Sequence, residues 1–245
     1  ILQAKTDNFV YLHTQGDNNT FTKTTIKTYV ALAGLTSADF DEDGKMDYAY
    51  ASYLSNAGRL WVKPHRATEI EISTKLIRKI TTADMNADGL IDIVYGTVSG
   101  EIGWFENDGS NGFTDHGFAS GYSSVFEIAT GDIDGDGDID VSYTAPEDNI
   151  VAVMINDGSG NLSGQDIFTN TIAHKPYRLE MGDVDGDMDL DVVAVYTNAS
   201  AAEAQVMVFK NGLIRFDPPE VTSELSSITI DEDTEDGGVC SSSHT

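Results

Sequence analysis

Basic side chains are scarce in this sequence. It has 14 lysines and arginines against 41 aspartates and glutamates, which gives a net charge of −27. Binding of nucleic acid needs clustered lysine and arginine, and attraction to an anionic membrane surface needs them too, so the charge balance argues against both partners. The stretch from Ile80 to His174 has no basic residue but 17 acidic ones. Carboxylates at this density favour either a solvated acidic face or bound cations.

Cysteine and long apolar runs are also nearly absent. Cys240 is the one cysteine, so no disulfide can form within the chain. The longest apolar run is about Val192–Tyr196, whereas a membrane-spanning helix needs roughly 20 apolar residues, so we expect no membrane insertion. No signal peptide is visible at Ile1, so we expect a chain that is cytosolic or already processed.

Helical periodicity is missing as well, and five prolines with 23 glycines favour short strands and tight turns. What the sequence has instead is an acidic motif, Asp-x-Asp/Asn-x-Asp-x-x-x-Asp, that occurs four times. The copies begin at Asp39, Asp84, Asp132 and Asp183, with gaps of 45, 48 and 51 residues. A repeat of this length predicts an array of similar supersecondary units.

Each copy of the motif lies among short segments with strand character, rich in β-branched and aromatic residues and too short for helices. The segments before the motif are Gly34–Ala38, Ile80–Ala83, Ile128–Gly131 and Leu179–Gly182. The runs after it are Tyr48–Tyr50, Ile91–Tyr95, Ile139–Tyr143 and Leu190–Tyr196. The predicted third strands are Leu60–Lys63, Ile102–Glu106, Val151–Ile155 and Val206–Lys210. Weaker fourth strands follow, for instance at Ile70–Thr74 and Gly112–His116.

Four antiparallel strands in each repeat of about 40 to 50 residues are the pattern of β-propeller blades, so we predict an all-β propeller. Explicit turns at Asn107, Asn156 and Asn211 follow three of the third strands and support antiparallel pairing. We predict a single domain over residues 1–240 with a tail at 241–245.

The two ends of the chain bear on the number of blades. Phe9–His13 and Phe21–Ile26 resemble a third and a fourth strand, and the segments around Ile228–Ile230 and Val239 resemble a first and a second strand. We therefore predict five blades, one of them completed by both termini, which would close the ring and remove the sheet edges. The alternative is a fragment of a larger, seven-bladed propeller.

The acidic motifs have the composition of metal-binding loops. Oxygen side chains stand at positions 1, 3, 5 and 9, and the backbone carbonyl at position 7 offers a fifth oxygen. The predicted ligands are Asp39, Asp41, Asp43, Lys45 and Asp47; Asp84, Asn86, Asp88, Leu90 and Asp92; Asp132, Asp134, Asp136, Asp138 and Asp140; Asp183, Asp185, Asp187, Asp189 and Asp191. All-oxygen ligands on a flexible loop favour Ca²⁺ over zinc, copper or magnesium. We therefore expect about four calcium ions, in loops at 39–47, 84–92, 132–140 and 183–191.

Alternatives to four calcium loops are weaker. An EF-hand needs a glutamate at position 12 and flanking helices, but position 12 is Tyr50, Tyr95, Tyr143 or Ala194. Acidic hairpins that bind nothing are less expected when four of them are in phase with a strand repeat. Position 6 is glycine in three loops but Met188 in the fourth, so the turn or the affinity is expected to differ there. A fifth loop near 231–239 is degenerate.

The runs Gly131-Asp-Ile-Asp-Gly-Asp-Gly-Asp-Ile-Asp-Val and Gly182-Asp-Val-Asp-Gly-Asp-Met-Asp-Leu-Asp-Val-Val resemble FG-GAP/VCBS repeats, and so does Trp104-Phe-Glu-Asn-Asp-Gly. The resemblance covers the chain from about Phe9 to Val239. It implies propeller blades with calcium in the hairpin between the first two strands, held at positions 1, 3, 5 and 9. Similar repeats occur in integrin α-subunit heads, in fungal propeller lectins and in many secreted or surface proteins. They commonly form seven blades, whereas this chain has room for about five.

No catalytic group is recognisable. None of the five histidines stands beside a nucleophile or in a metal-binding spacing, and the obvious carboxylate pairs belong to the metal loops. We expect Trp61 and Trp104 to pack between blades, with sugar stacking as the alternative. The basic residues Lys63, Arg66, Lys75, Arg78 and Lys79 form either a contact patch or a solvated strand face.

The function that follows is a non-catalytic, calcium-stabilised module for adhesion, protein interaction or structural assembly, extracellular or at the cell surface. Its partner would be a protein or a glycan. Asn18, Asn161 and Asn198 stand in glycosylation sequons, which support that location weakly. The alternatives are a carbohydrate-binding lectin and an accessory or catalytic domain of a polysaccharide-active enzyme.

Overall fold

The computed structural model describes the chain from residue 2 to residue 216 with gaps: 2–5, 9–15, 20–27, 32–54, 57–65, 67–119, 121–169, 174–198, 204–212 and 215–216. Within these ranges every regular element is a β-strand. The described part of the chain accordingly offers no helix that is long and apolar enough to span a membrane. The predicted C-terminal strands, the degenerate loop at 231–239 and Cys240 lie outside these ranges.

Three sheets have four antiparallel strands each, paired in chain order. The first contains β4 (Leu32–Ala38), β5 (Asp47–Leu54), β6 (Ala57–Lys63) and β7 (Ile70–Ser73). The second contains β8 (Ile77–Ala83), β9 (Asp92–Thr97), β10 (Glu101–Asn107) and β11 (Phe113–Ala119). The third contains β12 (Glu127–Gly131), β13 (Asp140–Ala145), β14 (Ile150–Asn156) and β15 (Leu162–Thr169). The predicted four-stranded blades are therefore confirmed for three of the four repeats within the described residues.

Three smaller sheets complete the described chain. One contains β16 (Lys175–Gly182), β17 (Asp191–Thr197) and β18 (Ala204–Phe209), and it carries the fourth acidic loop. Another contains β1 (Leu2–Lys5), β2 (Phe9–Gln15) and β3 (Phe21–Lys27). The last pairs β19 (Asn211–Gly212) with β20 (Arg215–Phe216).

The N-terminal sheet differs from the prediction in one strand. β2 and β3 were expected, but β1 also pairs with β2, with Leu2 opposite Leu12. β1 takes the place beside β2 for which a C-terminal segment was predicted. Its four residues are too few to show an alternating pattern in the sequence.

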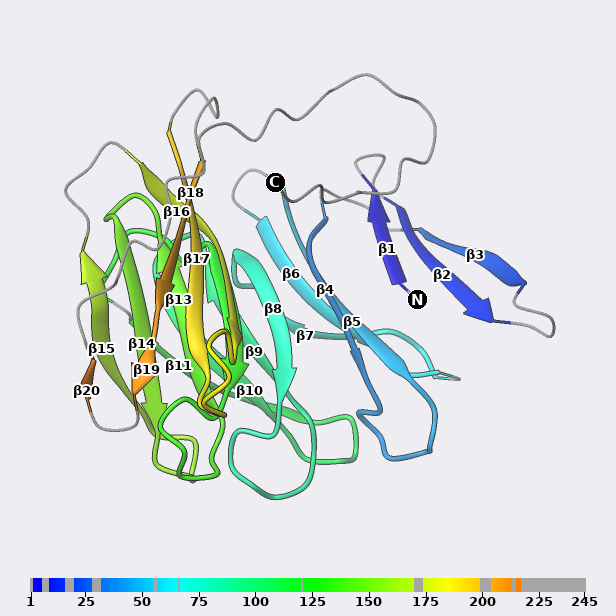
Figure 1. Ribbon diagram of the computed structural model, residues 1–245. Helices are drawn as coiled ribbons and strands as arrows, with labels where there is room; N and C mark the ends of the chain where they lie inside the picture. The colour runs from blue at the N-terminus through cyan, green and yellow to red at the C-terminus, as the bar shows by residue number, and fades with distance from the viewer. Residues whose placement is uncertain are drawn as a thin grey trace.

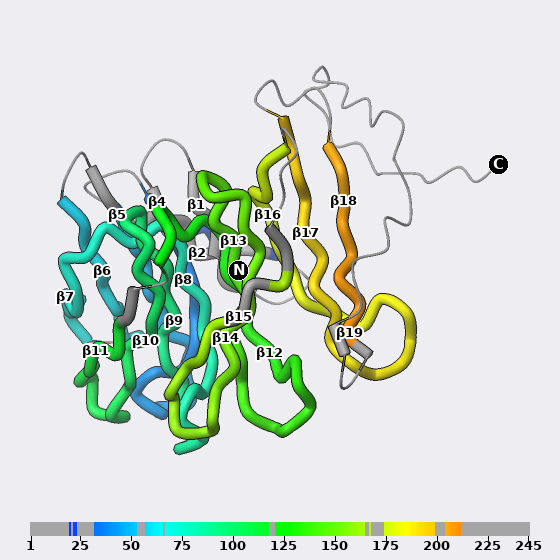
Figure 2. Tube along the Cα trace, turned by 90° about the vertical axis from the view of Figure 1, so that its left-hand side faces the viewer, coloured from blue at the N-terminus to red at the C-terminus, as the bar shows by residue number. Residues whose placement is uncertain are grey.

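The sheets stand side by side like the blades of a propeller (Figure 1). The first strands of consecutive blades, β4, β8, β12 and β16, contact one another in that order along the inside of the array. Figure 2, turned by 90°, shows the β16–β18 sheet following the β12–β15 sheet. The all-β propeller class is thus confirmed, while the number of blades stays a prediction.

The hydrophobic core lies between neighbouring blades. Every residue of β9 is buried, because its alternate side chains enter two different clusters. Ile93 and Tyr95 pack with residues of the β4–β7 blade, whereas Val94 packs with residues of the β12–β15 blade. Coverage on both faces explains why these strands read as continuous apolar runs in the sequence.

Candidate metal sites

The four acidic loops each connect the first strand of a blade to its second strand. They follow Ala38, Ala83, Gly131 and Gly182, which end β4, β8, β12 and β16. Because the inner strands of consecutive blades run the same way, the loops gather at one end of the array, at the lower ends of these strands in Figure 1.

Position 9 of every loop is a buried aspartate that joins two parts of its blade. In the second loop, Asp92 is fully buried; its Oδ2 accepts the N–H of Met85 at 2.9 Å and its Oδ1 accepts the N–H of Asn107 at 2.8 Å. The other three loops repeat this pair of bonds: Phe40 and His65 donate to Asp47, Ile133 and Asn156 to Asp140, and Val184 and Asn211 to Asp191. The aspartate thus links a residue near the start of the loop to a residue at or just after the end of the third strand.

Burial affects the ionisation of these aspartates. It raises the pKa of Asp92 to about 6, and it raises the pKa of Asp47 and of Asp140 as well. In each case the two backbone N–H donors oppose the shift, and neighbouring loop carboxylates add to it. A cation among these carboxylates would favour their charged forms.

Positions 1 and 5 are held by the backbone of the loop itself. In the third loop, Asp132 Oδ2 accepts the N–H of Gly137 at 3.0 Å, and Asp136 Oδ1 accepts the N–H of Asp138 at 2.9 Å. The same two bonds recur in the other loops, to Asp39 and Asp43, to Asp84 and Asp88, and to Asp183 and Asp187. The backbone of the loop therefore orients the carboxylates at positions 1 and 5 without the help of a bound ion.

All four loops share the same backbone signature, a positive φ at positions 4 and 6. The residues at position 4 are Glu42, Ala87, Gly135 and Gly186, and those at position 6 are Gly44, Gly89, Gly137 and Met188. Met188 has a φ of 77° and its side chain is 90% exposed. The fourth loop therefore keeps the turn that glycine makes elsewhere, and the expected change of turn at Met188 does not occur. The strain of a left-handed methionine remains in its place.

The structure brings three carboxylates together in three of the four loops. The groups are Asp39, Asp41 and Asp43; Asp132, Asp134 and Asp136; and Asp183, Asp185 and Asp191. In each group one oxygen per residue lies within 4.8 Å of the others. Such clusters could hold ions, because carboxylates at this spacing repel one another without a cation. The donors are all oxygen, which fits calcium and does not fit zinc or copper.

Two loops differ from the others in the groups that surround their predicted ligands. In the second loop Asn86 replaces a carboxylate; its Oδ1 accepts the N–H of Asp88, and its Nδ2 lies 3.1 Å from Asp88 Oδ2 and 3.4 Å from Glu106 Oε1. In the fourth loop the cluster includes Asp191 in place of Asp187, and Lys210 Nζ lies 3.5 Å from Asp185 Oδ2. The position 7 carbonyls remain predicted ligands.

An asparagine at the end of the third strand connects the loops to one another. Asn156 Nδ2 donates to the carbonyl of Met85 in the preceding blade's loop at 2.7 Å, and to the carbonyl of Ile139 in its own loop at 3.0 Å. Asn107 does the same with Phe40 and Ile91, and Asn211 donates to Ile133. In the sequence, these asparagines are recognisable only as turn residues. Their recurrence at one position of the repeat was the signal that could have identified them.

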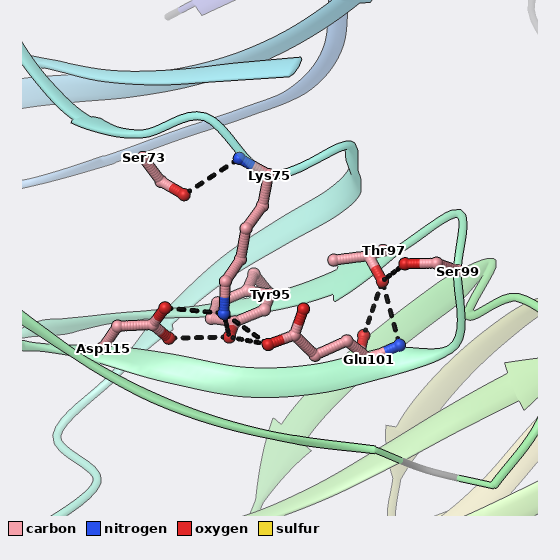
Figure 3. Close-up of polar contacts among 7 residues, drawn as sticks. All are labelled: Ser73, Lys75, Tyr95, Thr97, Ser99, Glu101 and Asp115. Carbon is pink, nitrogen blue, oxygen red and sulfur yellow. Dashed lines mark hydrogen bonds and ion pairs between the residues drawn. The ribbon is translucent and has the colours of Figure 1, made fainter. Parts of the chain in front are cut away.

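A second polar cluster joins two blades away from the loops (Figure 3). Lys75, in the turn between β7 and β8, places Nζ 2.5 Å from Tyr95 Oη and 2.6 Å from Asp115 Oδ2, and it also pairs with Glu101. Tyr95 Oη donates to Asp115 Oδ1 at 2.7 Å. Burial, supported by the two carboxylates, raises the pKa of the Tyr95 hydroxyl. Lys75 is therefore neither a free contact patch nor a solvated residue but a link between blades.

The tryptophans behave largely as expected. Trp104 is 2% exposed, and its Nε1 donates to the carbonyl of Gly160 in the next blade at 3.2 Å. Packing between blades is thus confirmed for Trp104. Trp61 is half-buried and stacks on Tyr50, with ring centroids 5.0 Å apart.

Comparison with known proteins agrees with this geometry. A family of FG-GAP-like repeats matches residues 84–143 and 132–194. No curated protein sequence matches the chain significantly. Among solved structures, a mutant of the Aleuria aurantia lectin in complex with alpha-methyl-L-fucoside is similar, with a TM-score of 0.53 and 14% identity over 86% of this chain and 69% of that chain.

A second solved structure is BBS1N in complex with ARL6DN, soaked with mercury. It has a TM-score of 0.49 and 11% identity, over 84% of this chain and 73% of that chain. At such identities the likeness to the lectin is one of fold alone. The repeats, the blades and the family match agree, so residues 84–194 carry FG-GAP-like repeats.

Proposed function

We propose that the chain is a non-catalytic propeller module whose acidic loops bind about four calcium ions, and that it serves in adhesion, protein interaction or structural assembly. The observation that carries the proposal is the repeated three-carboxylate cluster at one end of the blades. Asp132, Asp134 and Asp136 each accept a backbone N–H of their own loop, and one carboxylate oxygen of each lies within 4.8 Å of the others. Such preorganisation suits a cation and would be unfavourable without one.

The role of calcium in this proposal is structural. In the first three loops, the position 9 aspartate and the asparagine of the next blade connect the loop to the third strands on both sides, as Asp92, Asn107 and Asn156 do around the second loop. An ion that fixes one loop would therefore also stiffen the contact between two blades. A rigid surface made in this way suits recognition of a partner at the blade ends.

The test is thermal unfolding of the whole chain in millimolar calcium, in millimolar magnesium and in excess chelator. A single site at 100 times its dissociation constant adds about 2.7 kcal/mol to the free energy of unfolding. For a chain of this size that corresponds to a rise of roughly 5 to 10 °C in the midpoint. Calcium should give at least this rise and magnesium much less. Equal midpoints with and without chelator would contradict calcium binding by the native state.

The location that we propose is extracellular or at the cell surface. Two of the sequons lie in the described part of the chain; Asn161 is exposed in the turn before β15, and Asn198 directly follows β17. Asn161 Nδ2 also donates to Asp157 Oδ2 at 2.9 Å. Expression in a secreting eukaryotic host followed by mass spectrometry tests accessibility, because an attached glycan at Asn161 would require passage through the secretory route. The third sequon, at Asn18, lies outside the described residues.

A lectin is the second candidate. It is favoured by the fold likeness to a lectin that was solved with a bound fucoside. A glycan array with the calcium-loaded chain separates the two candidates. Binding to one class of sugars, abolished by a substitution outside the acidic loops, would support the lectin and contradict a pure protein-interaction module.

A further inference from the structure

A cavity of about 280 Å³ lies where the inner strands of four consecutive blades begin. The residues around it include Leu32 of β4, Arg78 and Lys79 of β8, Phe126 and Glu127 at the start of β12, and Arg178 of β16. The acidic loops follow the other ends of the same strands. Strands of about seven residues separate the two ends by roughly 20 Å. The cavity is therefore separate from the candidate metal sites.

The charge of this cavity is opposite to that of the chain. Three of its residues are cationic, and the chain has only 14 lysines and arginines against 41 acidic residues. Glu127 is the one carboxylate among the lining residues, and its side chain is only 7% exposed. Lys79 Nζ pairs with one of its oxygens, and Arg178 Nη1 lies 3.0 Å from the other. Two cations share one carboxylate, so positive charge is left over.

Arg78 supplies a further positive charge with free donors. Its guanidinium carbon lies 4.3 Å from the centroid of the Phe126 ring, and Tyr177 meets the same ring edge-on with centroids 5.1 Å apart. This stacking holds the guanidinium plane in place. Arg78 Nε is buried, and among the described residues it has no hydrogen-bond partner. A buried donor without a partner is unfavourable, and an incoming acceptor would remove that penalty.

We propose that this cavity binds a small ligand that carries an oxyanion, with Arg78 as the main contact. The planar guanidinium fork matches the oxygens of a carboxylate or a sulfate. The volume is at the low end for ligand sites, which limits the ligand to about the size of a monosaccharide. Because the rest of the chain is strongly acidic, its long-range field opposes an incoming anion, and salt screens that repulsion beyond about 8 Å.

The experiment is isothermal titration of the calcium-loaded full chain with sulfate, with glucuronate and with glucose as the neutral control. Saturable binding of either anion is expected, and R78Q should weaken it at least about tenfold, the loss of one charged hydrogen bond. The matched control is R59Q, since Arg59 pairs with Glu71 on the β6–β7 hairpin, 48% exposed and away from the cavity. This control should leave the affinity within about twofold.

The possible results distinguish an inorganic anion from a sugar acid as the ligand, and they distinguish failure of the anion site from failure of the calcium sites. Binding of sulfate alone identifies a free inorganic anion, and binding of glucuronate alone identifies a sugar acid. Binding of neither anion, equal losses in R78Q and R59Q, or equal binding of glucose would overturn the proposal. If R78Q does not fold, R178Q replaces it, because the Arg178 side chain is 69% exposed and its removal leaves the core intact. The calcium-dependent rise in the melting midpoint should persist in both variants, so that failure here leaves the metal sites untouched.

Discussion

Asn107 donates a hydrogen bond from Nδ2 to the backbone carbonyl of Phe40 at 2.8 Å, although 67 positions separate the two residues in the sequence. The bond joins the end of a third strand to the acidic loop of the preceding blade. Asn107 Nδ2 also donates to the carbonyl of Ile91, which lies in the acidic loop of the same blade as Asn107. The acidic loops are therefore connected in series through buried amides.

Replacement of Asn156 tests this connection. N156A removes the donor to the carbonyls of Met85 and Ile139, of which the first bond is buried and the second partly buried. We expect a loss of roughly 1 to 3 kcal/mol in the free energy of unfolding by urea denaturation. The control is N161A, because Asn161 is exposed and, among the described residues, its side chain bonds only within its own turn, to Asp157. Equal losses in the two variants would contradict a special role for Asn156.

The left-handed methionine gives a prediction of the opposite sign. Met188 has a φ of 77° and makes little contact, with 90% of its surface exposed. M188G should raise the free energy of unfolding by up to about 1 kcal/mol, because relief of strain outweighs the added freedom of the unfolded chain.

Met46 provides the matched control, since it is also an exposed loop methionine, 61% exposed, but without a positive φ. M46G should lower the free energy of unfolding by about 0.5 to 1 kcal/mol. If M188G destabilised the chain as much as M46G does, the strain at position 188 would be disproved.

Close packing between blades predicts a large effect at Gly160. A Cβ there would lie 2.2 Å from the Trp104 ring, and the φ of Gly160 is 76°. Gly186 has a φ of 86° with nothing within 4 Å of its Cβ position, so G186A isolates the backbone effect. We expect G160A to cost at least about 2 kcal/mol more than G186A, measured by urea unfolding with tryptophan fluorescence. Similar costs would show that the blades separate easily at this contact.

Removal of Lys75 tests the cluster in Figure 3. K75M leaves Glu101 and Asp115 facing each other beside the Tyr95 hydroxyl, without their shared cation. We expect a loss of about 1 to 2 kcal/mol, moderated because all three side chains are partly exposed. K175M is the control, since Lys175 pairs with a single exposed carboxylate, Glu147, and should matter little. A neutral K75M would show that the cluster does not join the blades.

The repeat and the strands could be predicted from the sequence because their signals are local. The alternating runs and the Asp spacing lie within about ten residues of each other, and each predicted strand is present to within a few residues in the described chain. β1 could not be predicted because its four residues are too few to show the alternation of apolar and polar side chains that indicates a strand. The number of blades depends on both termini, which the repeat pattern does not fix.

The partners of the site residues could not be predicted, because they are distant in the sequence. Asp92 was expected to be a ligand from its spacing, but nothing local shows that it also binds the N–H of Asn107 on the third strand. The positively charged cavity was missed for the same reason, since Arg78 and Arg178 are 100 residues apart and meet only when the inner strands converge. The composition shows that lysine and arginine are scarce, but it does not show where they lie together in the fold.

The most direct test of the central claim is a count of bound calcium ions per chain by equilibrium dialysis, for the wild type and for D136N. The account predicts about four ions for the wild type and one fewer for D136N, since Asp136 belongs to a three-carboxylate group in the third loop. D157N, which neutralises an exposed aspartate of the turn after β14, should leave the count unchanged. No bound calcium at millimolar concentration, or an equal count in D136N and the wild type, would contradict the account.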